Sequence, residues 1–66
     1  MGLLYDTVQR IDQVIASRGL DKFRTRGQIA LKTGFAISLV KSDTPDDPLK
    51  QRKLVEAAAA VLGQAI

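Results

Sequence analysis

The sequence contains neither cysteine nor histidine, and this absence constrains a chain of 66 residues more than any other feature. Domains below roughly 70–80 residues seldom gain enough stability from one hydrophobic core, and many rely on disulfides or a bound metal. Those supports need the two missing residue types, so the chain must depend on regular helix packing or on self-association. We expect residues 1–66 to form a single domain without a metal or a cofactor.

The same absence removes most routes to catalysis, because nucleophilic and proton-transfer chemistry relies heavily on these two side chains. The adjacent carboxylates Asp46 and Asp47 lie between prolines, where acidic residues more often cap a helix than act as an acid/base pair. Gly27 and Gly34 are isolated, so no glycine-rich phosphate loop is present. We expect neither an enzyme nor a small-molecule ligand.

Two segments carry apolar residues at helical spacing. The first covers residues 3–18 and is followed by Gly19, a residue type typical of a helix C-terminus. The second begins at Pro48, with Asp47 as its cap, and ends at Gly63. Their apolar positions are Leu4, Val8, Ile11 and Ile15 in the first segment, and Leu54, Ala58, Val61 and Leu62 in the second.

The middle of the chain predicts two shorter helices. Thr25 and Gln28 form a capping-box pattern, which predicts a helix from Arg26 to Gly34. Residues 36–42 can form the next helix, with Leu39 and Val40 on its inner face, and Leu20 and Phe23 are expected to fill the gap between helices. No segment alternates with period two, so we expect a compact all-α domain of four or five helices.

The formal charge of +3 is unevenly distributed. Six basic residues lie between Arg18 and Lys41 with the single acid Asp21, and three acids crowd the loop 43–47. A basic segment suits an anionic partner, but it is equally typical of a solvated polar face. No apolar run is long enough to span a bilayer, so we expect a soluble, cytoplasmic protein without membrane contact.

The stretch from Thr25 to Ser42 resembles the helix-turn-helix of phage and bacterial regulators. The resemblance rests on Ala30, on Gly34 four residues later and on Val40 six residues after that. Together with the preceding helix and the following proline-containing loop and helix, nearly the whole chain is similar to the lambda repressor/Cro-like family. That resemblance implies a central helix-turn-helix whose second short helix, residues 36–42, lies in the major groove of double-stranded DNA.

The resemblance also implies contact residues and assembly. The base-reading positions would be Ala36, Ile37, Ser38, Lys41 and Ser42, and the phosphate contacts would be Thr25, Arg26, Gln28 and Lys32. Each has an alternative, because Ile37 is as suited to a core as to a thymine methyl and Arg26 is also an ordinary surface residue. Members of the family often bind as homodimers, and the acidic loop 43–47 is expected to face away from DNA.

The sequence therefore favours a sequence-selective DNA-binding protein of the repressor type, associated with the nucleoid. A second hypothesis is a helical interaction module, an adaptor or an antitoxin-like partner that uses its alanine-rich last helix. Its contact surface would consist of Ala57, Ala58, Val61 and Ile66. A third hypothesis keeps the DNA but assigns the protein to phage packaging or to recombination directionality.

Overall fold

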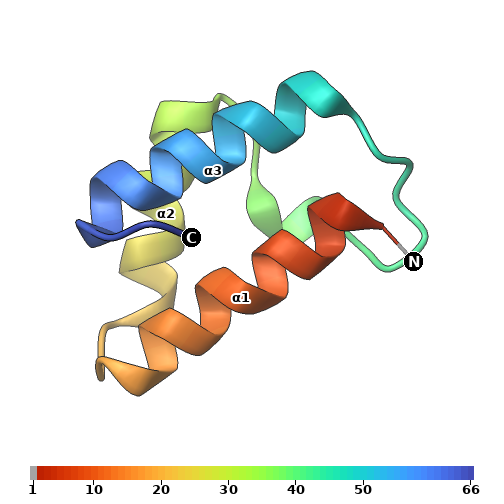
Figure 1. Cartoon of the computed structure of the whole chain (residues 1–66). Coiled ribbons are helices and arrows are strands. Elements are labelled where there is room, and N and C mark those ends of the chain that lie inside the picture. The colour runs from red at the N-terminus through yellow and green to blue at the C-terminus, as the bar shows by residue number, and fades with distance from the viewer. Residues whose placement is uncertain (1) are drawn as a thin grey trace.

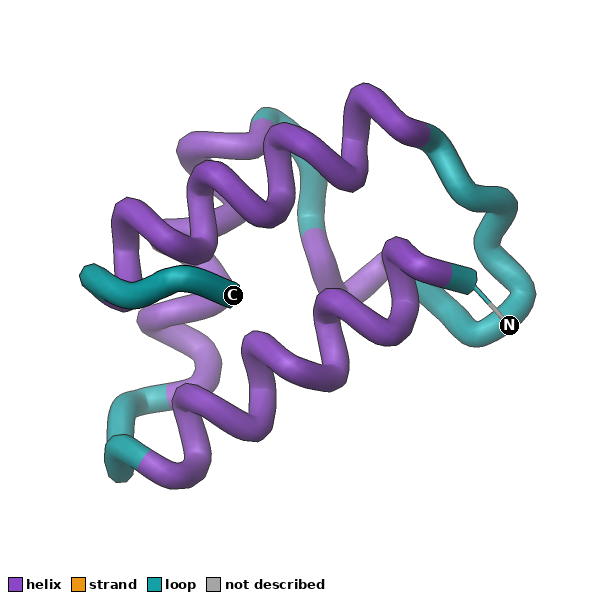
Figure 2. Tube along the Cα trace, viewed as in Figure 1, coloured by secondary structure: helices purple, strands orange, loops and turns teal. Residues whose placement is uncertain are grey.

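The computed structural model describes residues 2–66, which contain three α-helices and one short 3₁₀-helix. The elements are α1 (Leu3–Ser17), α2 (Lys22–Thr33), the 3₁₀-helix η1 (Ile37–Leu39) and α3 (Pro48–Leu62). Figure 1 and Figure 2 show α1 and α3 side by side with the same direction, and α2 crossing behind them. The all-α prediction is confirmed for these residues, but three α-helices replace the expected four or five.

The core lies between the three α-helices and consists of the predicted apolar stripes. On α1, Leu4, Val8, Ile11 and Ile15 are no more than 3% exposed. On α3, the buried residues are Leu54, Ala57, Ala58 and Leu62, while Val61 and Ile66 are half-buried against them. The alanine-rich face therefore packs inside the molecule, and Ala57 and Ala58 are not available as an exposed contact surface.

The outer helices end where the sequence predicts. Gly19 and Gly63 adopt left-handed φ values of 64° and 68°, which cost glycine little. The carboxylate of Asp47 accepts hydrogen bonds from the backbone N–H groups of Leu49 and Lys50 at 3.0 and 3.3 Å, and Pro48 occupies the first turn of α3. The predictions for both helix C-termini and for the Asp47 cap are confirmed.

Helix α2 begins at Lys22, so the prediction of a capping box at Thr25 and a start at Arg26 is wrong. Asp21 is the N-cap, and its carboxylate accepts a hydrogen bond from the N–H of Arg24 at 2.9 Å. Thr25 lies in the first turns of the helix and is only 7% exposed. A competent cap four residues upstream therefore starts the helix earlier, while the Gly34 end is confirmed by its φ of 83°.

The longer α2 carries Phe23 on its outer side. Phe23 is 84% exposed and Leu20 is 37% exposed, so the prediction that both fill the gap between helices is wrong. Ile29 of α2 is fully buried and, unlike Leu20 and Phe23, belongs to the core.

Residues 36–42 do not form the predicted helix. Only Ile37–Leu39 is helical, as a 3₁₀ turn, and Val40 already has extended backbone angles. The N–H of Lys41, which would bond to Ile37 in an α-helix, donates instead to the hydroxyl of Thr44 at 2.8 Å. Val40 points into the core as predicted, but Leu39 is 73% exposed.

Two polar contacts hold α3 to α1. The guanidinium of Arg18 donates to the carbonyl of Leu62 and, at 3.2 Å, to the side chain of Gln64 at the C-terminal end of α3. Near the other end, the amide of Gln51 donates to the buried hydroxyl of Thr7 at 2.6 Å. These contacts fix the register between the two parallel helices.

Candidate nucleic-acid interface

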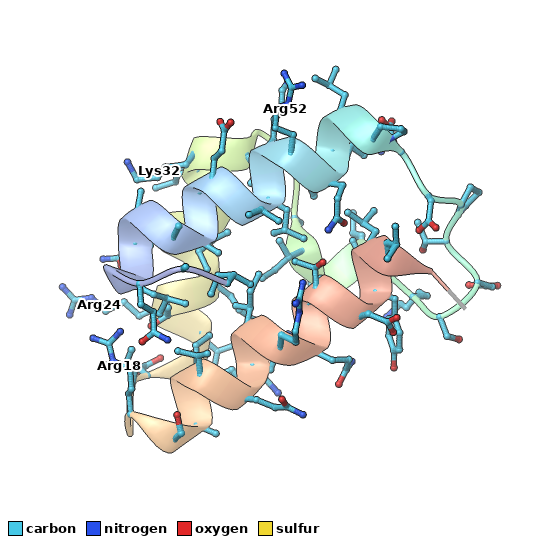
Figure 3. All side chains as sticks on the ribbon, viewed as in Figure 1. Arg18, Arg24, Lys32 and Arg52 are labelled. Atoms are coloured by element: carbon cyan, nitrogen blue, oxygen red, sulfur yellow. The ribbon has the colours of Figure 1, made fainter. Side chains whose placement is uncertain are left out.

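Helix α2 is the basic element of the fold. It contains Lys22, Arg24, Arg26 and Lys32 and no acidic residue between its bounds. Figure 3 shows that Arg18, Arg24, Lys32 and Arg52 all point outward along one edge of the molecule. Three of the six basic residues between Arg18 and Lys41, namely Arg18, Arg24 and Lys32, therefore lie on one side of the fold (Figure 3).

We call the residues Arg18, Arg24, Gln28, Lys32 and Lys53 the basic strip. Arg24, Gln28 and Lys32 are exposed and follow one another at intervals of four residues on α2, so they share one face over about 12 Å. A shallow groove of about 250 Å³ brings Arg18, Arg24 and Gln28 together, and a second of about 300 Å³ joins Lys32 to Lys53 of α3.

Most cations of the strip are available for an anionic partner. Arg24, Lys32 and Lys53 make no ion pair within residues 2–66. Arg18 is engaged at the end of α3, and the acids Asp21 and Glu56 line the two grooves beside the strip. Asp21 is occupied as the cap of α2.

Two predicted phosphate contacts face elsewhere. The guanidinium of Arg26 forms a bidentate ion pair with Asp12 of α1, with Nε to Oδ1 at 2.9 Å and Nη2 against Oδ2. Thr25 is buried. Neither Thr25 nor Arg26 therefore offers a free side chain to a phosphate. Gln28 and Lys32, in contrast, lie in the strip as exposed side chains.

The predicted base-reading residues do not form one surface with the strip. Ile37 is 2% exposed and belongs to the core, so its assignment to a base contact is wrong. Ala36, Ser38, Lys41 and Ser42 are exposed but lie on the 3₁₀ turn and its flanks rather than on a helix face. No regular recognition helix presents them.

The segment after Val40 lies at the opposite end of the molecule from Arg18 and the start of α2 (Figure 1). Asp46 contacts the N-terminus of α1, whereas Arg18 follows its C-terminus, and a helix of 15 residues is about 22 Å long. Figure 1 shows the loop 41–47 at the far end from the start of α2. The acidic loop therefore lies away from the end of the strip formed by Arg18 and Arg24.

Arg24 and Lys53 were not identified from the sequence as members of the basic strip. The expected helix start at Arg26 left Arg24 outside the helix. The sequence does carry a signal for it, because Asp21 can cap a helix on which Arg24, Gln28 and Lys32 share one face. Lys53 comes close to Lys32 only because α2 packs against α3. No local pattern in the sequence could reveal that proximity.

Comparison of the chain with protein-family models, curated proteins and solved structures found no match. Within residues 2–66, no helix is long and apolar enough to cross a membrane.

Proposed function

We propose that this protein binds double-stranded DNA through the basic strip, with α2 placed along the phosphate backbone. One observation carries the proposal: Arg24, Gln28 and Lys32 lie on a single exposed helix face, and α2 contains no acid to neutralise them. B-DNA carries one phosphate per about 3.4 Å of helix axis in each strand, so a face of about 12 Å can meet more than one phosphate.

The two amino-terminal side chains of this face also suit base contacts. Arg24 can donate to the acceptors of guanine, and Gln28 can both donate to and accept from adenine. They take the place of the 36–42 segment as the proposed source of sequence selectivity. A regulator of the repressor type would then act by occupying its site, and binding as a homodimer stays a prediction of the family resemblance.

Affinity for a labelled 24-base-pair duplex, measured by fluorescence anisotropy at several salt concentrations, tests the proposal. Each lost phosphate contact reduces the slope of log K against log salt by about one. We expect Lys32→Gln to produce that reduction, and Arg24→Gln to weaken binding by about 1–3 kcal/mol through its lost base contact. The matched control is Lys41→Gln, which removes the same charge from an exposed residue at the other end of the molecule.

Equal effects of Lys41→Gln and Arg24→Gln would overturn the assignment of the surface. Absence of duplex binding at 50 mM salt would overturn the function itself, because phosphate attraction is strong at low ionic strength. Circular dichroism of each variant verifies that the helical fold is retained.

Selection from random-sequence DNA tests the regulator role separately. A sequence-selective dimer enriches an inverted repeat with half-sites about one helical turn apart. We expect that enrichment to be lost in Arg24→Gln and Gln28→Ala and to be retained in Ser38→Ala. Enrichment that depends on Ser38 or Ser42 instead would place base reading on the 36–42 segment.

A further inference from the structure

The outermost face of α2 is apolar, which sets it apart from the basic strip beside it. Phe23 and Leu31 are 84% and 86% exposed, the highest values among the large apolar side chains of the described chain. They stand eight residues apart, with Gly27 midway, so all three follow one line along the helix. We call Phe23, Gly27 and Leu31 the α2 ridge.

A hollow lies beside the ridge, at the point where α2 has its smallest residues. Its volume is about 370 Å³, and its lining consists of Gly27, Ala30, Leu31, Gly34, Phe35 and Ala36. A Cβ atom built at Gly27 would meet no heavy atom within 4 Å. Leu31 and Phe35 line this hollow, and Phe23 lies farther along the ridge toward the start of α2. An apolar surface with such a gap lets a helix approach closely and insert an apolar side chain.

The charge around the ridge disfavours a second copy of this chain as the occupant. Two copies joined at Gly27 would bring together two α2 helices, each of which carries Lys22, Arg24, Arg26 and Lys32. No acidic residue of α2 could compensate these charges. Like charges brought together on an apolar interface weaken it.

An acidic amphipathic helix has the complementary properties. Its apolar side would cover Phe23 and Leu31, and its carboxylates would meet Arg24 beside the ridge and Lys32 farther around the helix, on the side of α3. We propose that the α2 ridge docks an acidic amphipathic helix of a partner protein. This inference does not depend on DNA binding, but the two partners share Arg24 and Lys32, so they exclude each other.

A helical peptide library is the probe that tests the docking surface. The library presents an alanine-based helix of about 20 residues with seven surface positions randomised, and the immobilised full chain selects from it in 150 mM salt. We expect enrichment of Leu, Phe or Met along one stripe and of Asp or Glu beside it. The best peptide is then synthesised and titrated by fluorescence anisotropy.

Variants of the chain decide whether the selected peptide uses the ridge. Phe23→Ser and Leu31→Ser each should weaken binding at least tenfold, and Arg24→Glu should do the same through the carboxylates. The matched controls are Leu39→Ser and Leu49→Ser, because these apolar residues are 73% and 58% exposed but lie outside α2. Binding to the controls should stay within twofold of the original chain.

Three results would overturn the proposal. They are a library without enriched sequences, an enriched set without acidic residues, and peptide binding that survives both ridge substitutions. Sedimentation of the chain alone tests whether a second copy of the chain occupies the ridge. A dimer that dissociates in Phe23→Ser would assign the ridge to that second copy. Loss of duplex affinity in Phe23→Ser would assign the ridge to DNA, whereas unchanged duplex affinity keeps the two surfaces distinct.

Discussion

Asp46 and Asp47 are neighbours in the chain, yet their carboxylates hold the N-termini of two different helices. Asp46 accepts a hydrogen bond from the N–H of Leu4 in α1 at 3.2 Å, and Asp47 accepts from the first turn of α3. Gly2, the N-cap position of α1, has no side chain to serve that purpose. The acidic loop thus ties together the starts of the two parallel helices.

Loss of either cap should destabilise the fold. We expect Asp46→Ala and Asp47→Ala each to lower the free energy of unfolding by about 1 kcal/mol, the usual cost of a lost N-cap. Urea denaturation followed by circular dichroism measures the change. Asp43→Ala is the control, because that exposed residue caps no helix and should change stability by less than about 0.5 kcal/mol. An equal cost for Asp43→Ala would refute the capping role.

Alanine at two glycines of the second helix should have opposite effects. Gly27 has ordinary helical backbone and open space at its Cβ position, so Gly27→Ala should stabilise the chain by about 0.5–1 kcal/mol. Gly34 ends the helix at a φ of 83°, so Gly34→Ala should destabilise it by about 1–2 kcal/mol. Thermal melts of the two variants should therefore shift in opposite directions, and shifts of the same sign would contradict the assigned conformations.

The ion pair between Asp12 and Arg26 should contribute to stability and not to DNA binding. Both side chains are about one-fifth exposed, and a double-mutant cycle with Asp12→Ala and Arg26→Ala should give a coupling energy of about 1 kcal/mol. Arg26→Gln should leave the salt dependence of duplex binding unchanged. Lys32→Gln should show the reverse pattern. A reduced slope in Arg26→Gln would show that DNA displaces Asp12.

The buried pair formed by Thr7 and Gln51 offers a test of polar packing. Thr7 is 1% exposed, donates to the carbonyl of Leu3 at 2.9 Å and accepts from the Gln51 amide. Thr7→Val leaves that amide without a partner, so it should cost about 1–3 kcal/mol. The double variant Thr7→Val, Gln51→Met should recover most of the loss. A double variant as unstable as Thr7→Val alone would show that the hydroxyl matters for another reason.

The elements that the sequence predicts correctly are those with strong local signals. The outer helices have regular apolar stripes, and each ends at a glycine in the left-handed conformation. Their boundaries depend on these residues and on Asp47, all of which act within a few positions of where they stand. Such features can be predicted without knowledge of the tertiary structure.

The middle of the chain was mispredicted because two possible caps compete there and because side chains capture backbone groups. Asp21 starts α2 ahead of the Thr25 pattern, and Thr44 takes the N–H of Lys41 from the expected helix. Ile37 and Val40 satisfy the spacing of a helix and of a 3₁₀ turn equally well, since both put residues three apart on one side. For this reason the proposed DNA-binding residues lie on α2 and not on the segment 36–42.

Amide chemical-shift mapping of the uniformly labelled chain tests most directly whether α2, and not the segment 36–42, contacts DNA. We expect titration with the 24-base-pair duplex to shift the backbone signals of Arg24, Gln28, Lys32 and Lys53, while those of Ser38 and Lys41 stay in place. Shifts concentrated on Ser38, Lys41 and Ser42, with α2 unaffected, would contradict the account.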